Sequence, residues 1–463
     1  MAGPPANRSR NVLSKLTRLS YQSVGGEMTG RSILAEPIVI TGIGLVASVG
    51  NDRESVWRAV RHGESQFGPI HGLRGIPDGY VLASMVDMPG QPTTRMKSIR
   101  LGQLAAEEAL RDGRVQLGEL DRTRFGCSIS GHMGDTRWIE GDAGVPAAEG
   151  DVPWHEQWMP NTACSTIANQ YGLLGPRFCH STACSTSLFS VLSAVRAIRD
   201  RSCDIALAGG GDAIEPLFVA GFKQMRVLAD DPDPRRACRP FDRNRKGFVF
   251  GEGAAMFVIE RLGHAIRRGA RIYAEIKAFA SLAQGYHMTG VDADSDSMEY
   301  LIRKTLERAE MEPDDIGYIN AHGTGTEQND AAEATAIRRV FSAHSDRFCV
   351  SATKSILGHM INAAGAAELA VTTLALRDGF APPTLNLDDP DPICTFDCVP
   401  GVGRANRFQH AMKLSLAFGG HLVALLLSRW NDAATGFGYP NASNLLLPTL
   451  PTHSPNVDFR RSM

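Results

Sequence analysis

The chain has 463 residues, of which 43% are hydrophobic and 21% are charged, a composition typical of a globular protein. A net charge of -2 argues against a nucleic-acid partner, and no apolar run approaches the roughly 20 residues that cross a bilayer, so we expect no membrane segment. The nine cysteines are scattered without a C-x-x-C pair, which favours reduced thiols in a cytoplasmic protein over a disulfide framework or a metal site.

The two ends of the chain differ from its middle. Residues 1–36 are basic, with no acidic residue before Glu27, and we expect either a targeting segment or a disordered leader there. From residue 431 the chain becomes rich in Pro, Asn and Ser, which predicts a flexible tail over residues 431–463. Between these ends we expect two halves, residues 37–285 and 286–430.

The middle of the chain alternates short apolar runs with helical patterns, which is typical of an α/β protein. In chain order, the predicted strands are residues 38–41, 125–130, 178–182, 204–208, 272–278, 316–320, 348–352, 412–417 and 421–427. The predicted helices are residues 52–60, 101–112, 188–199, 298–310, 331–341 and 363–377. Helix 188–199 has an apolar stripe with small Ser and Ala residues between its members, so it should pack closely against its neighbours.

Three local patterns recur in the same order in the two halves. Residues 125–131 parallel 316–322, residues 179–184 parallel 349–354, and residues 205–210 parallel 414–420. Each match is weak alone, but the shared order predicts an internal duplication with a cleft between the halves.

The strongest local motif is Ser181-Thr-Ala-Cys184-Ser-Thr-Ser187, directly before the helix at 188–199. A thiol at a helix start faces the positive end of the helix dipole, which favours the thiolate and lowers the pKa. A buried cysteine that packs as a small apolar residue is the other interpretation. The sequence Thr162-Ala-Cys164-Ser-Thr166 is identical to Thr182–Thr186 and offers a second candidate cysteine. The short segment after it predicts a weaker helix, so we favour Cys184.

Two histidines follow predicted strands of the second half. His322 lies in Asn320-Ala-His-Gly-Thr-Gly-Thr326, and His359 lies in Lys354-Ser-Ile-Leu-Gly-His359 before another small-residue helix. Each histidine alone is more often structural, but two neutral imidazoles in one site can donate hydrogen bonds to a developing enolate. Lys354 either holds them by its charge or is a solvated surface residue.

Three further segments have both a functional and a structural interpretation. Phe418-Gly-Gly420 is a turn that either donates an N–H to an oxyanion or, more simply, closes a hairpin. The arginine-rich residues 235–246 suggest a solvated basic loop. Asp330 and Glu333 suggest a metal pair or, more simply, a salt bridge at the start of a helix.

Together these segments resemble the elongating beta-ketoacyl-acyl-carrier-protein synthases, closest to the type II bacterial enzymes, over about residues 37–430. The motifs that carry the resemblance are Thr182-Ala-Cys184, Arg239-Pro-Phe-Asp242, Gly251-Glu-Gly-Ala254, Tyr286-His-Met-Thr289, Asn320-Ala-His-Gly-Thr324, Lys354-Ser-Ile-Leu-Gly-His359, Ala363-Ala-Gly-Ala366, Pro382-Pro-Thr-Leu-Asn386 and Phe418-Gly-Gly420. The resemblance implies a duplicated thiolase-type fold, a five-layer α/β/α/β/α sandwich. It also implies a homodimer, or a heterodimer with a related subunit.

The resemblance also implies catalytic roles. Cys184 would accept the acyl chain, and His322 and His359 would assist malonyl decarboxylation and stabilise the enolate. Lys354 would support the histidines, and the backbone N–H groups of Cys184 and Phe418 would form the oxyanion hole. The Phe418 ring would act as a gate.

Further residues are implied to support these groups or to bind the substrate. Glu368, Asp330 and Glu333 would be the acids behind the catalytic residues. Thr324, Thr326 and Thr289 would bind the pantetheine arm of the substrate. Lys223 and Arg226 would meet the acidic acyl carrier protein.

The implied activity is that of an acyltransferase in fatty-acid or polyketide biosynthesis. It would condense an acyl group with malonyl-acyl-carrier protein without a metal or redox cofactor, because the substrate itself carries the phosphopantetheine. Two alternatives remain, a non-catalytic subunit that sets chain length and a thiolase that uses coenzyme A. His421-Leu422 and Ser185-Thr-Ser187 depart from the commonest fatty-acid pattern, so chain length and pathway stay open.

Overall fold

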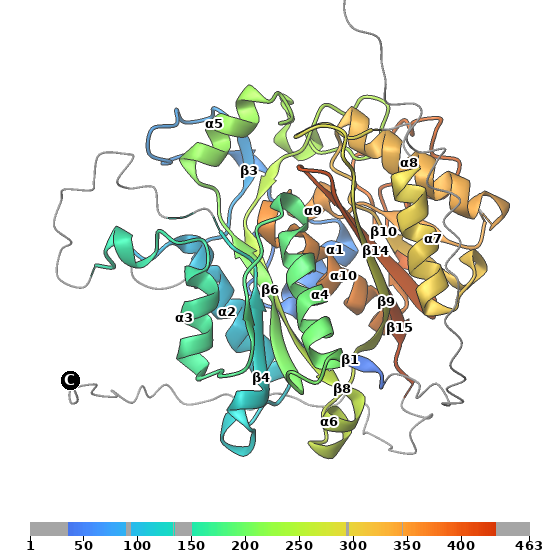
Figure 1. Cartoon of the computed structure of the whole chain (residues 1–463). Coiled ribbons are helices and arrows are strands. Elements are labelled where there is room, and N and C mark those ends of the chain that lie inside the picture. Colours follow the sequence, from blue (N-terminus) through green and yellow to red (C-terminus); the bar gives the residue numbers. More distant parts are fainter. Residues whose placement is uncertain are drawn as a thin grey trace, which may run out of the picture. The chain divides into compact units, whose positions relative to one another are not determined.

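The computed structural model describes residues 36–88, 94–132, 134, 151–292, 296–344 and 346–431 (Figure 1). The predicted leader, apart from Glu36, and the predicted tail, apart from Asn431, lie outside the described residues. The main strands are β1 (Ile38–Ala47), β4 (Phe125–Ile129), β5 (Arg177–Phe178), β6 (Ile205–Asp212), β8 (Gly253–Arg261), β9 (Ala274–Ala283), β10 (Tyr318–Asn320), β11 (Cys349–Ser351), β14 (His410–Ala417) and β15 (His421–Arg429). The helices are α1 (Arg53–His62), α2 (Lys97–Asp112), α3 (Thr162–Tyr171), α4 (Thr186–Arg199), α5 (Pro216–Gln224), α6 (Leu262–Arg267), α7 (Ser297–Ala309), α8 (Glu327–Phe341), α9 (Lys354–Leu357) and α10 (Ala364–Asp378).

The strand order of the main sheet is a mirror of itself. In the described residues the order is β5-β4-β6-β8-β1 followed by β9-β15-β14-β10-β11. Within the first half, β4 pairs in parallel with β5 and β6, and β8 pairs antiparallel with β6 and β1. Within the second half, β10 pairs in parallel with β11 and β14, and β15 pairs antiparallel with β14 and β9. The predicted duplication is therefore confirmed, because each matched segment begins or ends at an equivalent strand.

In the part of the chain that the structure describes, the two halves of the sheet meet only at β1 and β9, where Val39 pairs with Glu275 and Ile40 with Ala274. By contrast, β9 pairs with β15 along the whole length of β15. The predicted division at residue 285 places β9 with the first half of the chain, and that division stays a prediction.

Helices lie on both faces of each half-sheet (Figure 1). Helices α1, α4 and α10 share one hydrophobic core with residues from both halves, so they form the central layer. Helices α2 and α3 pack on the outer face of the first half, and α7 and α8 on the outer face of the second. This arrangement is the predicted five-layer α/β/α/β/α sandwich of the thiolase type.

The central helix α4 is buried along its apolar stripe. Leu188, Val191, Leu192, Val195 and Ile198 are fully buried, as the helical spacing predicts. Helix α10 is buried over almost its whole length, because it lies between the two half-sheets.

Several predicted boundaries are wrong. Strand β1 continues to Ala47 rather than ending at residue 41, because Gly42 and Gly44 let the carbonyls of α2 lie directly on the strand. The strand predicted at 178–182 is only Arg177–Phe178, and the main strand β8 and the helix α5 were not predicted.

Shorter strands lie outside the main sheet: β2 (Gly68–Pro69), β3 (Leu82–Ser84), β7 (Phe250–Gly251), β12 (Phe380–Ala381) and β13 (Arg404–Ala405). Among the described helices, none has both the length and the apolar character required to cross a membrane.

Candidate active site

The candidate nucleophile, Cys184, lies in a tight turn that leads into α4. The turn Ala183–Ser185 is a 3-10 helix, and Ala183 has a left-handed φ of 45°, which is unusual for a residue other than glycine. The Thr186 hydroxyl oxygen accepts from the backbone N–H of Thr182 at 2.8 Å and lies 2.6 Å from the Ala183 carbonyl oxygen, to which it donates. These bonds hold the turn, so the sulfur projects from the start of the central helix.

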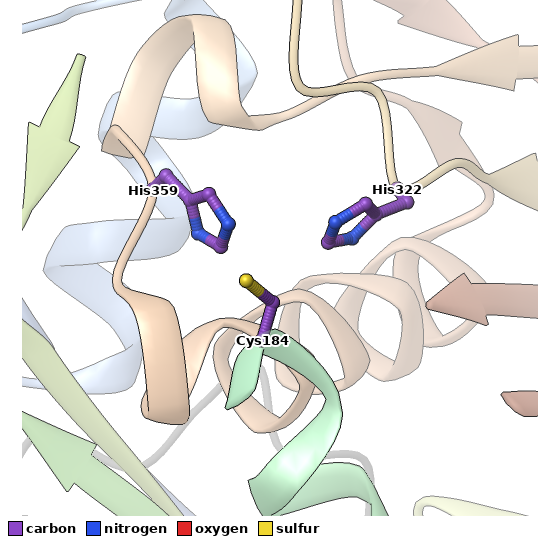
Figure 2. Close-up of side chains that lie close together, drawn as sticks. All are labelled: Cys184, His322 and His359. Carbon is purple, nitrogen blue, oxygen red and sulfur yellow. The ribbon is translucent and has the colours of Figure 1, made fainter. Parts of the chain in front are cut away.

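Two histidines face this sulfur from the second half of the chain (Figure 2). The sulfur of Cys184 and a ring nitrogen of each of His322 and His359 all lie within 4.8 Å of one another. His322 follows β10 and His359 follows α9, and their ring centroids are 5.5 Å apart. All three side chains are buried. Within the described residues they are also the one cysteine, histidine and acid cluster whose donor atoms lie close enough to hold a metal ion.

Both imidazoles are held in the same neutral tautomer. The Nδ1 of His359 lies 3.2 Å from the backbone N–H of Ile361, and the Nδ1 of His322 lies 3.2 Å from the Lys354 ammonium. Both of these neighbours can only donate, so each Nδ1 accepts and each neutral ring carries its proton on Nε2. Burial, together with the charges of Lys354 and Lys413, lowers the pKa of both histidines well below the usual value.

Lys354 is fully buried, which excludes the interpretation of a solvated surface lysine. Its ammonium donates to the His322 carbonyl at 2.6 Å and to Glu368 at 2.5 Å. The other oxygen of Glu368 lies 2.6 Å from the ammonium of Lys413, which also donates to the Ala321 carbonyl at 3.0 Å. A carboxylate between two ammonium groups therefore fixes both the backbone and the side chain of His322.

Glu333 and Asp330 bind the backbone of the histidine loop rather than a metal or a helix-start cation. Glu333 accepts from the N–H groups of His322 at 2.6 Å and of Gly323 at 2.8 Å. Asp330 accepts from Gly325 at 3.1 Å and from Phe241 at 2.8 Å, and lies 3.9 Å from Arg245. The salt bridge expected at the start of this helix is thus a minor contact of Asp330, because the backbone N–H groups are nearer.

The pKa of Cys184 differs from the expectation drawn from the helix dipole. Burial raises the pKa of this thiol to about 12, although the Lys354 charge and the Cys184 backbone N–H both lower it. Burial destabilises the thiolate by more than the Lys354 charge and the backbone N–H stabilise it. Burial therefore opposes the lowering of the pKa that the helix start predicts, and it favours the thiol.

A cavity of about 840 Å³ contains the three reactive side chains and most of the predicted substrate-binding residues. Thr324, Thr326 and Thr289 line it, and the hydroxyls of Thr324 and Thr326 lie 2.9 Å apart. Arg226 also lines the cavity, whereas Lys223 lies on α5 with its ammonium 5.1 Å from the Tyr80 ring centroid.

Phe418 also lines the cavity, in the turn between β14 and β15. Its ring stacks on Phe222 with centroids 6.0 Å apart. Gly419 and Gly420 both have positive φ values, of 81° and 76°, so the turn that carries the ring requires glycine.

Comparison with known proteins decides the family. The family models described as "Beta-ketoacyl synthase, N-terminal domain" and "Beta-ketoacyl synthase, C-terminal domain" match residues 35–265 and 273–388. The chain belongs to the beta-ketoacyl synthase family. Its members are condensing enzymes of fatty-acid and polyketide synthesis, so the resemblance inferred from the motifs is confirmed.

Relatives come from both pathways. The 3-oxoacyl-acyl-carrier-protein synthase 2 of Coxiella burnetii is 37% identical over 85% of this chain and 99% of its own length. The tetracenomycin polyketide synthase ketoacyl synthase alpha subunit of Streptomyces glaucescens is 35% identical over 85% of this chain and 97% of its own. A solved type II polyketide ketosynthase, in complex with its acyl-carrier protein, matches with a TM-score of 0.78 and 28% identity over 86% of this chain and 100% of its own.

In this beta-ketoacyl synthase family member, two further buried ionisable residues near the site, Lys413 and Asp212, were not predicted from the sequence. Lys413 stands inside the predicted strand 412–417, where a charge among apolar residues could have indicated a functional network. Asp212 ends β6 and accepts from the N–H groups of Asn362 at 2.9 Å and Ala213 at 3.0 Å. Burial raises the pKa of Asp212 to about 8 in spite of these two bonds.

The alternative cysteine, Cys164, lies in a different part of the molecule. It is inside α3, and its sulfur lies 3.8 Å from that of Cys127. It does not line the cavity that contains Cys184.

Proposed function

We propose that the chain is an acyltransferase that joins an acyl group held on Cys184 to malonyl-acyl-carrier protein, with loss of CO2. The observation that supports this most directly is the trio of reactive atoms within 4.8 Å, one sulfur and two neutral imidazoles. A nucleophile and two N–H donors in one buried cavity suit acyl transfer followed by enolate chemistry.

In the first half-reaction, the Cys184 sulfur attacks the carbonyl carbon of an acyl thioester on the carrier protein. A new carbon–sulfur bond forms, the bond to the pantetheine sulfur breaks, and the thiol proton ends on that leaving sulfur. Since burial favours the thiol, the transient sulfur anion needs support from the Lys354 charge and the two imidazole N–H groups. The backbone N–H groups of Cys184 and Phe418 are assigned to the carbonyl oxygen.

In the second half-reaction, malonyl-carrier protein enters and its carbon–carboxylate bond breaks. The electron pair passes to the thioester carbonyl, and the resulting enolate oxygen accepts hydrogen bonds from His322 and His359. The enolate carbon then attacks the acyl carbonyl on Cys184, the carbon–sulfur bond breaks, and the released thiolate takes up one proton. Neutral rings suit this role, because each already donates one N–H hydrogen bond and has no second, acidic proton to lose.

The proposed partner is an acyl carrier protein, whose pantetheine arm would pass Thr289, Thr324 and Thr326. We assign Lys223 to the carrier protein itself, and Arg226, which lines the cavity, to the place where the carrier protein and its arm meet. No metal or redox cofactor enters the proposed steps, and the working form is proposed to be a homodimer.

The decisive experiment separates the two half-reactions. Cys184→Ala should form no acyl-enzyme detectable by mass spectrometry and no condensation product. His322→Gln and His359→Gln should still become acylated, although more slowly because one donor to the transient sulfur anion is altered, while the condensation rate falls at least about 100-fold. Cys164→Ala is the matched control, and it should keep both activities.

A Cys184→Ala protein that condenses at the normal rate would refute the proposal. If the unmodified chain alone formed no acyl-enzyme, the proposed activity would give way to the non-catalytic chain-length subunit. If coenzyme A thioesters reacted better than carrier-bound ones, the thiolase alternative would replace it.

A further inference from the structure

The basic segment at residues 235–246 is mostly neutralised by nearby acids. Each of its five arginines lies within ion-pair distance of an aspartate: Arg235–Asp233, Arg236–Asp388, Arg239–Asp231, Arg243–Asp389 and Arg245–Asp391. These pairs hold the segment against the chain just before it, at Asp231 and Asp233, and against the distant loop at residues 388–391. They leave no excess charge on this part of the surface, so the five arginines are structural.

Lys246, the last residue of the segment, differs from these arginines. It is exposed, it lines the cavity that holds Cys184, and within the described residues it has no ion pair. Surface lysines without partners are common, so the position of Lys246 is what matters.

Backbone hydrogen bonds on both sides set that position. The N–H of Gly247 donates to the Gly325 carbonyl at 2.8 Å, and the N–H of Phe248 donates to the Val227 carbonyl at 3.0 Å. The chain at Lys246 therefore runs between the loop of Thr324 and Thr326 and the segment that begins at Arg226. Gly247 has a φ of 125°, and a side chain there would collide with the backbone of Val227, so the position is tightly held.

The exposed charges that line the cavity have a positive balance. Arg226 and Lys246 are cationic and Glu327 is anionic, and all three are exposed. Within the described residues, none of the three side chains forms an ion pair. The buried end of the cavity, by contrast, presents only the thiol and two neutral imidazoles to a ligand.

We propose that Lys246, together with Arg226, binds the phosphate of the phosphopantetheine arm. The inference rests on the proposed function, in which the arm enters this cavity with its sulfur at Cys184. The arm is neutral and amide-rich except for its phosphate, at the end far from the sulfur. With the sulfur at the buried end and the amides beside the threonines, the phosphate reaches the exposed end, where the two cations lie.

The test compares two small thioesters that differ only in the phosphate. The probes are acyl-phosphopantetheine and acyl-pantetheine, and the measurement is the concentration dependence of Cys184 acylation, followed by mass spectrometry. Lys246→Gln should raise the apparent KM for acyl-phosphopantetheine roughly fivefold and leave that for acyl-pantetheine unchanged, as expected for a solvent-exposed charge pair. Lys246→Glu should raise it further, because it replaces attraction with repulsion.

Arg243→Gln is the matched control, because Arg243 is an exposed cation of the same segment that does not line the cavity. It should change neither KM. An equal effect of Lys246→Gln on both thioesters, or none on the phosphate-bearing one, would overturn the proposal. A third result would also overturn it. If Lys246→Gln weakened the binding of the carrier protein without its arm as much as that of the carrier protein with its arm, Lys246 would contact the protein and not the phosphate.

Failure of the proposed function gives a different result. If the unmodified chain were not acylated by either thioester, calorimetric titration with phosphopantetheine and with pantetheine would still test the binding. Tighter binding of the phosphate-bearing compound, abolished by Lys246→Gln, would support the phosphate site. No difference between the two compounds would overturn it.

Discussion

His322 and His359 lie buried beside the ammonium groups of Lys354 and Lys413, so a proton is harder to add to either ring than to an exposed histidine. The pKa of each is lowered, and both rings stay neutral as the pH falls through the usual value of 6.5. This matters because only the neutral tautomer combines an accepting Nδ1 with a donating Nε2–H.

We predict that condensation keeps its rate as the pH is lowered from about 7.5 to about 6, a range in which an ordinary histidine passes its half-charged point at about 6.5. The measurement is the condensation rate of pre-acylated protein over that range, so that carrier-protein acylation does not limit it. An acidic limb centred at or above the usual histidine value would contradict the prediction.

Asp212 provides a second test at the level of one residue, through stability. Its pKa is raised by burial from 3.8 to about 8, so between these values the folded state holds a proton that the unfolded state has lost. The carboxyl therefore lowers stability progressively as the pH rises through this window. Asp212→Asn should remove that contribution, so that its unfolding free energy falls less steeply with pH than that of the unchanged protein.

Urea unfolding between about pH 5 and pH 8 measures this difference. Asp346→Asn is the control, because Asp346 is exposed and its replacement should leave the slope unchanged. Parallel stability curves for Asp212→Asn and the unchanged protein would contradict the prediction.

At the scale of the elements, the site depends on the close contact of α4 with α10. Gly365 of α10 lies against the start of α4, and a Cβ on it would approach the Leu188 Cβ to 2.9 Å and the Leu188 backbone nitrogen to 3.2 Å. Because Leu188 is only one helical turn after Cys184, this contact also sets the position of the sulfur.

We predict that Gly365→Ala lowers the unfolding free energy by about 1–3 kcal/mol, because one methyl group overfills the contact. Gly221→Ala in α5 is the matched control, since a Cβ there meets nothing within 4 Å. The same substitution should be neutral there, or stabilising by about 0.5–1 kcal/mol through the better helix propensity of alanine. Equal effects of the two substitutions in denaturant unfolding would contradict the assignment.

The close contact between α2 and β1 explains why neighbouring residues alone did not predict the full length of β1. Gly42 and Gly44 suggest a turn when only neighbouring residues are considered, and the predicted strand stops before them. In the fold they are inside β1, where added Cβ atoms would lie 2.3 Å and 1.9 Å from carbonyl oxygens of Ala109 and Ala105. Contact between elements distant in sequence, rather than local turn chemistry, accounts for both glycines.

At the scale of the whole molecule, the sheet ends at β5 in a short edge strand with an exposed apolar surface. Phe178 is 36% exposed, and Trp158 and Met159, beside the Pro160 that Cys179 contacts, are 51% and 46% exposed. Unpaired edge strands with apolar side chains favour pairing with another chain. This surface is therefore where the predicted homodimer would form.

We predict that the double variant Trp158→Asp with Phe178→Asp weakens self-association by at least about tenfold in dissociation constant, because it removes aromatic contacts and introduces charge repulsion. Analytical ultracentrifugation over a concentration series measures this change. Val402→Asp is the control, because Val402 is 77% exposed in a separate loop. Unchanged association of the double variant would place the dimer interface elsewhere.

The sequence alone determined the duplicated α/β architecture and the three reactive residues. Each recurring pattern lies where a strand passes into a loop or helix, and the strand periods and the small-residue helices are local properties that sequence displays directly. Cys184, His322, His359 and Lys354 could be named because each belongs to a short motif with a clear position. The threonines proposed to bind pantetheine were implied by the resemblance of these motifs to the family.

Tertiary structure alone decided the protonation states and the supporting charges. Burial raises the pKa of Cys184 against the effect of the helix start, and that burial depends on residues from both halves of the chain. Lys413 and Asp212 are identified as partners of the site only by the fold, which brings β14 to Glu368 and the end of β6 to Asn362. Lys246 likewise stood out from its arginine neighbours only when their aspartate partners, some of them about 150 residues away, were in place, since electrostatics depend on distance in space rather than along the sequence.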